Sequence, residues 1–288
     1  MHLSTIIAFT TAVSAVPLLS KRTVPGKNFQ QWGFLIFENT DFEDAEANAV
    51  FQEIQALNHN RLLSNYQAIT HPSLPNYLNS IAGTDFGVSD DGSPTNHAQS
   101  ASTILDLLEN KGISWKMYAE DYPGNCFKGA TNGVPHSYAA KHVPAIYFSA
   151  ITKNPKRCAN IVDASQFQKD FQAGTLPQWW YYVPNLNNDG HDTTVDYQAD
   201  YLRSTWLPML QNPAFTKDLA MVLTYDESAT YDAPNHVFAA LIGDALNPSL
   251  GREDTTAYDH YSLIKTVEDN WDLGNLGQND VGATAIAI

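Results

Sequence analysis

Apolar runs alternate with amphipathic stretches along most of the chain. Five runs rich in branched aliphatic and aromatic residues have the length of buried strands: 32–37, 113–119, 179–183, 219–225 and 237–242. Segments with apolar side chains at helical spacing occur at 44–57, 102–110, 197–211 and 261–273. This alternation predicts an α/β fold, a three-layer sandwich with a mostly parallel central sheet. The Pro-, Gly-, Asn- and His-rich region 123–159 should form a long excursion over that sheet.

Residues 70–83 predict a helix that begins beside a hydroxyl group. Pro75 suits the first turn of a helix, and Gly83 suits the left-handed residue that closes it. Ser73 should therefore lie at or just before the N-cap, where free N–H groups and the helix dipole favour an anion. Backbone groups alone would then stabilise a phosphoryl group on Ser73. An ordinary capping serine also explains this pattern.

Polar side chains directly follow two of the predicted strands. Ligands of open α/β sheets bind beyond the carboxyl ends of the strands, so these positions are candidates for a site. They are Glu38 and Asn39 after the run 32–37, and Asp226 and Glu227 after the run 219–225. With the Ser73 oxygen they offer an all-oxygen shell, which suits one hard divalent cation such as Ca²⁺, Mg²⁺ or Mn²⁺. Carboxylates at strand ends also occur as helix caps, and that alternative stays open.

The first 22 residues predict a secretory signal followed by a short pro-segment. The apolar run 3–19 is short for a membrane span, contains small residues at 13–15, and is followed by Lys21 and Arg22. We therefore expect a secreted protein, extracellular or in the cell wall, with one catalytic domain over residues 23–288. No later apolar run approaches membrane length, so stable membrane insertion is not expected.

The charge of the chain narrows the choice of partner. Without Lys21 and Arg22, 31 acidic side chains face 14 basic ones, a formal charge of −17. Nucleic acid and anionic membrane surfaces are therefore poor partners. The sequence indicates no protein partner. An anionic substrate would need local positive charge, which a metal ion or protonated histidines could supply.

Two cysteines, Cys126 and Cys158, are present in the whole sequence. An even number in an exported protein predicts one disulfide, worth roughly 3 to 4 kcal/mol in the loop-entropy model. Two thiols without further cysteines or suitably spaced histidines do not predict a zinc site.

Several motifs, in order, resemble the secreted fungal acid phosphatases. These enzymes belong to the phosphoesterase family that also contains phospholipases C, within the alkaline phosphatase-like superfamily, and the resemblance runs from about residue 32 to residue 277. The motifs are Phe37-Glu38-Asn39, the stretch 70–77 with Gly83, Ser114-Trp115, 118–121, Lys141-His142-Val143-Pro144, Pro184-Asn185, Asn188-Asp189-Gly190-His191, Tyr225-Asp226-Glu227 and 258–262.

The resemblance implies an alkaline phosphatase-like fold and a role for each matched residue. Ser73 matches the nucleophile that forms a phosphoserine. His142 and His191 match histidines that contact the phosphate, with Asp189 orienting one of them, and His260 matches either a phosphate contact or a structural cap. One divalent metal is implied, because the two-zinc motifs of the wider superfamily are absent. Its ligands would be Glu38, Asn39, Ser73, Asp226 and Glu227.

The implied activity is hydrolysis of small phosphate monoesters, and three alternatives remain. A phosphodiesterase or phospholipase C would use the same nucleophile and metal. A metal-free serine esterase would combine Ser73, His260 and an Asp, although the Gly-X-Ser-X-Gly motif is missing. A non-catalytic binding protein would use the acidic pairs only as caps. The sequence leaves the roles of His71, His136 and His236 open.

Overall fold

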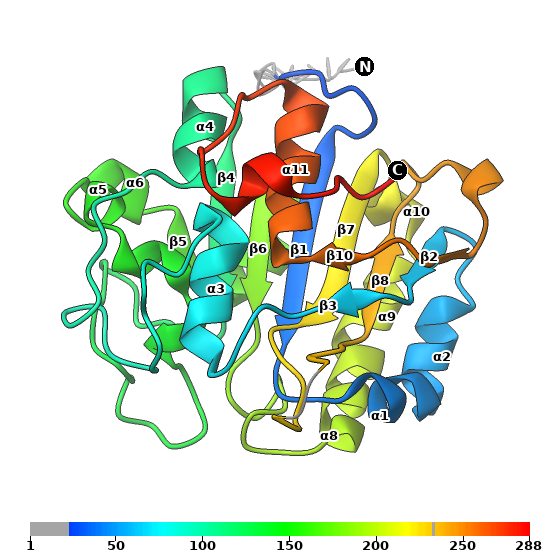
Figure 1. Ribbon diagram of the computed structural model, residues 1–288, viewed down its shortest axis with the longest axis horizontal. Helices are drawn as coiled ribbons and strands as arrows, with labels where there is room; N and C mark the ends of the chain where they lie inside the picture. Colours follow the sequence, from blue (N-terminus) through cyan, green and yellow to red (C-terminus); the bar gives the residue numbers. More distant parts are fainter. Residues whose placement is uncertain (1–22, 232–233) are drawn as a thin grey trace, which may run out of the picture.

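The computed structural model describes residues 23–231 and 234–288, and the predicted signal and pro-segment lie outside the described residues. Its central sheet has eight strands in the order β5-β4-β6-β1-β7-β8-β2-β9 (Figure 1). Within it, β8 runs antiparallel to both β7 and β2, and the other neighbours are parallel. The strands are β1 Gln31–Phe37, β2 Asn60–Leu63, β4 Trp115–Ala119, β5 Ile161–Asp163, β6 Trp179–Val183, β7 Leu219–Tyr225, β8 Ala239–Ile242 and β9 Glu253–Asp254. The predicted α/β sandwich with a mostly parallel sheet is confirmed.

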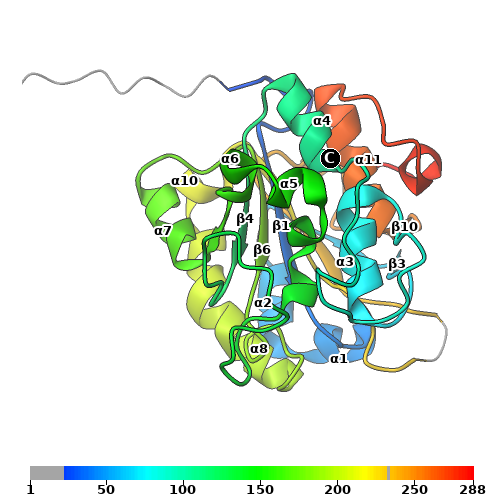
Figure 2. The ribbon, with the colours of Figure 1, turned by 90° about the vertical axis from the view of Figure 1, so that its left-hand side faces the viewer.

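Helices cover both faces of this sheet (Figure 2). On one face lie α3 Ser73–Ala82, α4 Ile104–Lys111 and α11 His260–Trp271, beside a small parallel sheet of β3 Tyr66–Gln67 and β10 Tyr258–Asp259. The other face carries α2 Ala49–Gln55, α7 Ser165–Gln172, α8 Val195–Tyr201, α9 Leu207–Leu210 and α10 Pro213–Thr216. Short helices complete the chain: α1 Phe42–Ala47, α5 Ser149–Thr152, α6 Pro155–Cys158, η1 Ala140–His142, η2 Pro144–Tyr147, η3 Leu202–Trp206, η4 Pro248–Leu250 and η5 Asn279–Gly282.

The core forms because the central strands are apolar on both faces. Every residue of β6 and β7 is buried, as are the last six residues of β1. Gly33 of β1 faces the Trp180 ring of β6, and a Cβ atom at Gly33 would lie 2.2 Å from that ring. The absence of a side chain at Gly33 thus lets the large indole pack directly against the centre of the sheet.

Two predicted helices are interrupted, each for a local reason. The helix predicted over 44–57 ends and restarts at Asn48, whose side chain accepts a hydrogen bond from the Val50 N–H and caps α2. The helix predicted over 197–211 contains the π-helical stretch η3. Pro208 follows this stretch and has no N–H to donate to the preceding turn, which favours a change of helical register there.

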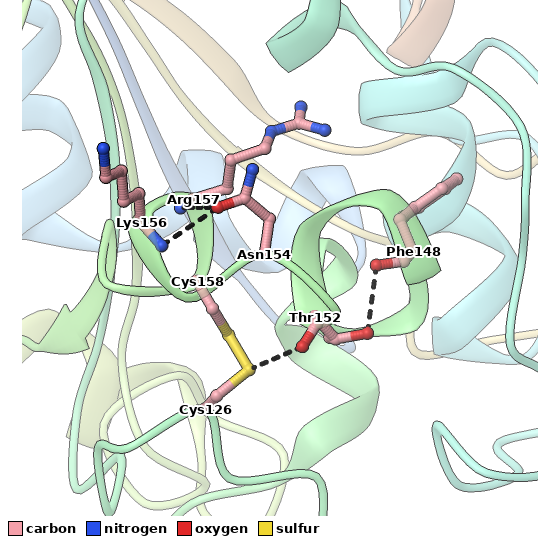
Figure 3. Close-up of a disulfide and its surroundings, with 7 residues drawn as sticks. All are labelled: Cys126, Phe148, Thr152, Asn154, Lys156, Arg157 and Cys158. Carbon is pink, nitrogen blue, oxygen red and sulfur yellow. Dashed lines mark hydrogen bonds between the residues drawn. A yellow bond between two sulfur atoms is a disulfide. The ribbon is translucent and has the colours of Figure 1, made fainter.

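The region 123–159 is an excursion that contains short helices and ends in a disulfide. Cys126 and Cys158 are joined, with a Cα–Cα separation of 5.6 Å, so the predicted disulfide is confirmed. Figure 3 shows that the bond links the loop at Cys126 to the end of α6, with Thr152 of α5 close by. None of the helices in 23–231 and 234–288 has both the length and the apolar character that crossing a bilayer requires.

Candidate active site

The strand ends that carry polar residues lie side by side at one edge of the sheet. β1 is paired with both β6 and β7, and Phe37 at its end is opposite Tyr225. The Glu38 N–H donates to the Asp189 carbonyl, and the Asp226 N–H donates to the Phe37 carbonyl. The side-chain amide of buried Gln198 links the residue after β1 to the loop after β6, because it donates to the carbonyls of both Glu38 and Asp189.

Ser73 is the first helical residue of α3, directly after the N-cap Pro72, and so lies one position later than the predicted place at or just before the N-cap. The helix ends at Gly83, whose φ of 70° is left-handed, as the sequence predicts. Ser73 is 2% exposed, and its hydroxyl donates to Glu38 Oε2 at 3.1 Å. The Leu74 N–H already donates to Asp91 Oδ1 at 3.0 Å, and Pro75 has no N–H. The first turn of α3 therefore has fewer free N–H groups than a helix N-terminus usually offers, and stabilisation of a phosphoryl group by the backbone stays a prediction.

His142 lies between two buried carboxylates. Its Nε2 is 3.0 Å from Glu38 Oε1, and its Nδ1 is 3.1 Å from Asp189 Oδ2. Burial opposes the charged imidazolium, but Glu38 and Asp189 together raise the pKa of His142 to about 9. Burial likewise opposes ionisation of Glu38, yet the neighbouring His142 holds the Glu38 pKa below its usual range. The contact thus favours a protonated His142 ring beside an ionised Glu38, as long as no cation replaces that proton. The His142 ring also stacks on Tyr77, with ring centres 4.9 Å apart.

His191 lies beside Lys141, and its ring centre is 5.7 Å from that of His142. Its backbone N–H donates to Asp189 Oδ1, and its Nδ1 is 2.7 Å from Asp192 Oδ1. Lys141 Nζ is 2.9 Å from His191 Nε2 and 3.3 Å from Ser73 Oγ. In the tautomer that satisfies both contacts, Nδ1–H donates to Asp192 and Nε2 accepts from Lys141.

Asp226, Glu227 and Asn39 complete the cluster. Asp226 Oδ1 accepts a long hydrogen bond of 3.4 Å from the Asn39 N–H, and the buried Asp226 Oδ2 has no hydrogen-bond partner among residues 23–231 and 234–288. Burial, with the charge of Glu38, raises the Asp226 pKa well above its usual value. Burial also raises the pKa of Glu227 to about 8, and its Oε2 lies 2.8 Å from His71 Nδ1. Asn39 has φ 50°, a left-handed conformation that asparagine tolerates better than most residues.

This arrangement fits a cation. Glu38, Ser73 and Asp226 converge with oxygen atoms, and the unpartnered Asp226 Oδ2 lacks the counter-charge that a buried carboxylate needs. A second set overlaps the first: ligand atoms of Glu38, His142 and His191 lie within 4.8 Å of one another. The sequence prediction assigned these histidines to phosphate alone, whereas the geometry also allows them to bind a metal.

His260 lies behind the cluster. Its Nε2 is 2.7 Å from the Asp226 carbonyl and its Nδ1 is 3.0 Å from the Tyr66 hydroxyl. Burial lowers the pKa of His260 to about 4, so the ring is neutral. Nε2–H then donates to the carbonyl, and Nδ1 accepts from Tyr66. Both ring nitrogens are thus engaged away from Ser73, so the contacts of His260 are those of a residue that supports the Asp226 backbone.

The three undecided histidines have separate surroundings. His71 stacks on exposed Tyr231 with ring centres 4.0 Å apart and contacts Glu227. His136 contacts Asp192, which also contacts His191. His236 stacks on Phe42 and contacts the Ser64 carbonyl.

Sequence reasoning assigned no role to Lys141, Asp91, Asn76 or Gln198. Lys141 adjoins His142 within a motif that resembles the family, which is a usable signal. Asn76 fixes the turn before α3, because its side chain contacts the backbone of Ile69 and Thr70. Asp91 and Gln198 reach the site from a loop and a helix that carry no motif, so no local pattern could have identified them.

Comparison with known proteins places these features in a family. The sequence profile described as the Phosphoesterase family matches residues 54–274. A probable acid phosphatase of Kluyveromyces lactis is 38% identical over 273 residues, covering 92% of this chain and 63% of that protein. An acid phosphatase of Aspergillus fumigatus is 36% identical, covering 96% of this chain and 62% of that protein. The chain therefore spans less than two thirds of the length of these relatives.

The fold has solved counterparts. A Vibrio parahaemolyticus protein of the alkaline phosphatase superfamily aligns with a TM-score of 0.58 at 12% identity, covering 96% of this chain and 76% of that one. This confirms the alkaline phosphatase-like fold. Because the family profile covers most of the chain and the acid phosphatases share more than a third of their aligned residues with it, the chain belongs to the phosphoesterase family.

Proposed function

We propose that this chain hydrolyses phosphate monoesters by transferring the phosphoryl group first to Ser73 and then to water. The observation that carries the proposal is the setting of Ser73 Oγ, which donates to an ionised Glu38 and accepts from Lys141 at the start of a helix. A hydroxyl held by a carboxylate on one side and a cation on the other is poised as a nucleophile. The acid phosphatase relatives support the same reaction class.

The reaction consists of two displacements at phosphorus. In the first, the Ser73 Oγ–P bond forms and the ester P–O bond breaks, while the Ser73 proton leaves along its hydrogen bond to Glu38. The released alkoxide takes a proton from water. In the second, water attacks phosphorus and gives a proton to the hydroxide left by the first step, the P–Oγ bond breaks, Ser73 takes back its proton from Glu38 and inorganic phosphate departs.

A divalent metal would supply a lower pKa for the Ser73 hydroxyl and a counter-charge for the phosphoryl oxygens. The proposed ligands are Glu38, Asn39, Ser73, Asp226 and Glu227. His142 holds Glu38 in place and His191 faces the phosphoryl group, with Asp189 positioning both through its two oxygens. His260 acts as a positioning residue for Asp226.

We also propose that the protein works outside the cell, as the predicted signal implies. A disulfide is stable in an oxidising compartment, and the one between Cys126 and Cys158 suits such a location.

A single assay series tests the activity. Purified protein should release phosphate from p-nitrophenyl phosphate, and a strong chelator should abolish the release. Ser73→Ala should lose several orders of magnitude in kcat. The matched control is Ser80→Ala in the same helix, where the hydroxyl forms hydrogen bonds with the Tyr77 carbonyl and the Tyr181 hydroxyl. It should keep its activity.

The alternatives predict different results. Faster hydrolysis of bis(p-nitrophenyl) phosphate would favour a phosphodiesterase or phospholipase C. Chelator-resistant hydrolysis of p-nitrophenyl acetate would favour a serine esterase, although His260 does not contact Ser73. No hydrolysis of any ester, in acidic or alkaline buffer, would contradict the proposal and leave a binding protein.

A further inference from the structure

Lys141 brings a positive charge into the carboxylate cluster. It belongs to η1, its side chain is 15% exposed, and its ammonium group contacts Ser73, His191 and Asp91. Over residues 23–231 and 234–288, it is the one lysine or arginine whose side chain contacts Ser73 or the residues proposed to act with it. Burying an ammonium group is costly unless it is paired, so its position there calls for an explanation.

The charge balance of the site gives that explanation. A phosphate monoester is a dianion near neutral pH, and at Ser73 it would lie close to the buried carboxyl groups of Glu38, Asp189, Asp226 and Glu227. One divalent cation offsets only part of this negative charge. In a phosphoryl group on Ser73, the phosphorus lies one bond beyond Oγ and its oxygens lie two bonds beyond Oγ. An ammonium group 3.3 Å from Oγ can therefore donate to one of them.

Asp91 determines where this ammonium group lies. Its Oδ2 is 2.9 Å from Lys141 Nζ, while its Oδ1 accepts from the Leu74 N–H at 3.0 Å. The carboxylate thus fastens the lysine to the first turn of α3, the same turn that carries Ser73. The distance between nucleophile and cation is fixed by one short chain of contacts.

We propose, on the basis of the proposed function, that Lys141 is a catalytic residue that donates to a phosphoryl oxygen during transfer to and from Ser73, and that Asp91 is its positioning residue. The cation strengthens binding of dianionic groups, so it favours monoesters over singly charged diesters. Lys141 therefore contributes to substrate choice as well as to rate.

Substitution of Lys141 tests the first part. Lys141→Met keeps the stem and removes the charge, and should lower kcat/KM for p-nitrophenyl phosphate by about 10²- to 10³-fold, the usual effect of losing one donor to a developing anion. Binding of inorganic phosphate, measured by calorimetry on metal-loaded protein, should weaken by about tenfold or more. Lys141→Arg should restore part of both. The control Lys116→Met, on β4, removes a lysine that is paired with the buried Asp170 of α7, and it should change neither quantity.

The double variant tests the second part. Asp91→Asn should lower kcat/KM by about tenfold, as expected for a lost positioning contact. Combined with Lys141→Met, it should cause no further loss, because Asp91 acts through the lysine. Losses that multiply in the double variant would overturn the positioning role.

The outcomes separate this inference from the proposed function. The inference about Lys141 would be overturned, and the proposed function would stand, if the wild-type protein were an active phosphatase and Lys141→Met changed neither phosphate binding nor the ratio of monoester to diester hydrolysis. A wild-type protein without phosphatase activity would contradict the proposed function. Phosphate binding that still depended on Lys141 would then support an anion site without the chemistry.

Discussion

Glu38 is the residue on which the contacts of the site converge. Its Oε2 accepts from Ser73, its Oε1 faces His142, and its backbone N–H joins the end of β1 to Asp189 in the loop after β6. The neighbouring His142 holds the pKa of Glu38 below its usual range even though Glu38 is fully buried. Asp226, which lacks such a partner, has a raised pKa. Two neighbouring carboxylates thus differ through their surroundings, and Asp226 is the one that a cation would stabilise most.

Asp226→Asn should therefore lose metal and activity together while the fold persists. The amide keeps the shape of the side chain but removes the charge that attracts a divalent cation. Metal content by elemental analysis and phosphate release would both be measured. Asp163→Asn, which changes a carboxylate at the end of β5, provides the control. An Asp226→Asn protein with full metal occupancy and rate would show that the ligand set is wrongly assigned.

Among the helices and strands, α3 is an element that local sequence pattern predicts well. Pro75 and Gly83 predict both the helix and the left-handed residue that ends it. The long apolar strands β1, β6 and β7 are predictable for a similar reason, because burial on both faces leaves an unbroken apolar run. The short strands β2, β3, β5, β9 and β10 were not predicted. Each has only two to four residues, which is too short for a recognisable alternation of apolar and polar positions. These segments become strands because they pair with neighbouring strands.

The residues of the candidate site likewise fall into those that local sequence pattern predicts and those that it does not. Residues that follow a predictable strand or begin a predictable helix, such as Glu38, Asp226 and Ser73, could be identified from sequence. The contacts of Lys141 with Asp91, and of His260 with the Asp226 carbonyl, depend on segments far apart in the chain. Tertiary packing creates them, so no local pattern contains them.

The disulfide belongs to the excursion, not to the site. Replacing both Cys126 and Cys158 with Ser should lower the free energy of unfolding by about 3 to 4 kcal/mol in the loop-entropy model, since the bond closes a long loop. Phosphatase kcat should not change, because neither cysteine contacts the cluster around Ser73. Thermal melts and steady-state assays on the same preparation would check both. A large fall in kcat in protein that remains folded would contradict the separation.

For the whole molecule, buried acidic groups link stability to pH. Glu268 of α11 is 2% exposed and faces Asp280 of η5, with Lys265 and Asp269 also nearby. Burial and the charge of Asp280 raise the Glu268 pKa from 4.5 to about 8. Asp280 in turn accepts from the N–H groups of Leu276 and Gln278. Glu268 of α11 and Asp280 in the segment after it therefore face each other, and the raised pKa of Glu268 means that its protonated form is favoured in the folded protein.

Stability should consequently decrease as the pH rises from about 4.5 to about 8. In this range the folded protein keeps the Glu268 proton that the unfolded chain has lost, and proton release favours unfolding. The melting temperature should fall across the window, and Glu268→Gln should flatten the decline. Glu46→Gln, on the exposed surface of α1, should not. An unchanged slope in Glu268→Gln would assign the pH dependence to other groups.

The most direct test of the proposed mechanism is to trap the phosphoryl group on the protein. Wild-type protein should be quenched in acid during turnover of p-nitrophenyl phosphate, digested, and analysed by mass spectrometry. A peptide that contains Ser73 should be heavier by one phosphoryl group, and fragmentation should locate that group on Ser73. Ser73→Ala protein should give no modified peptide. A phosphoryl group on a histidine, or near-normal turnover in Ser73→Ala, would contradict the mechanism even if the protein is a phosphatase.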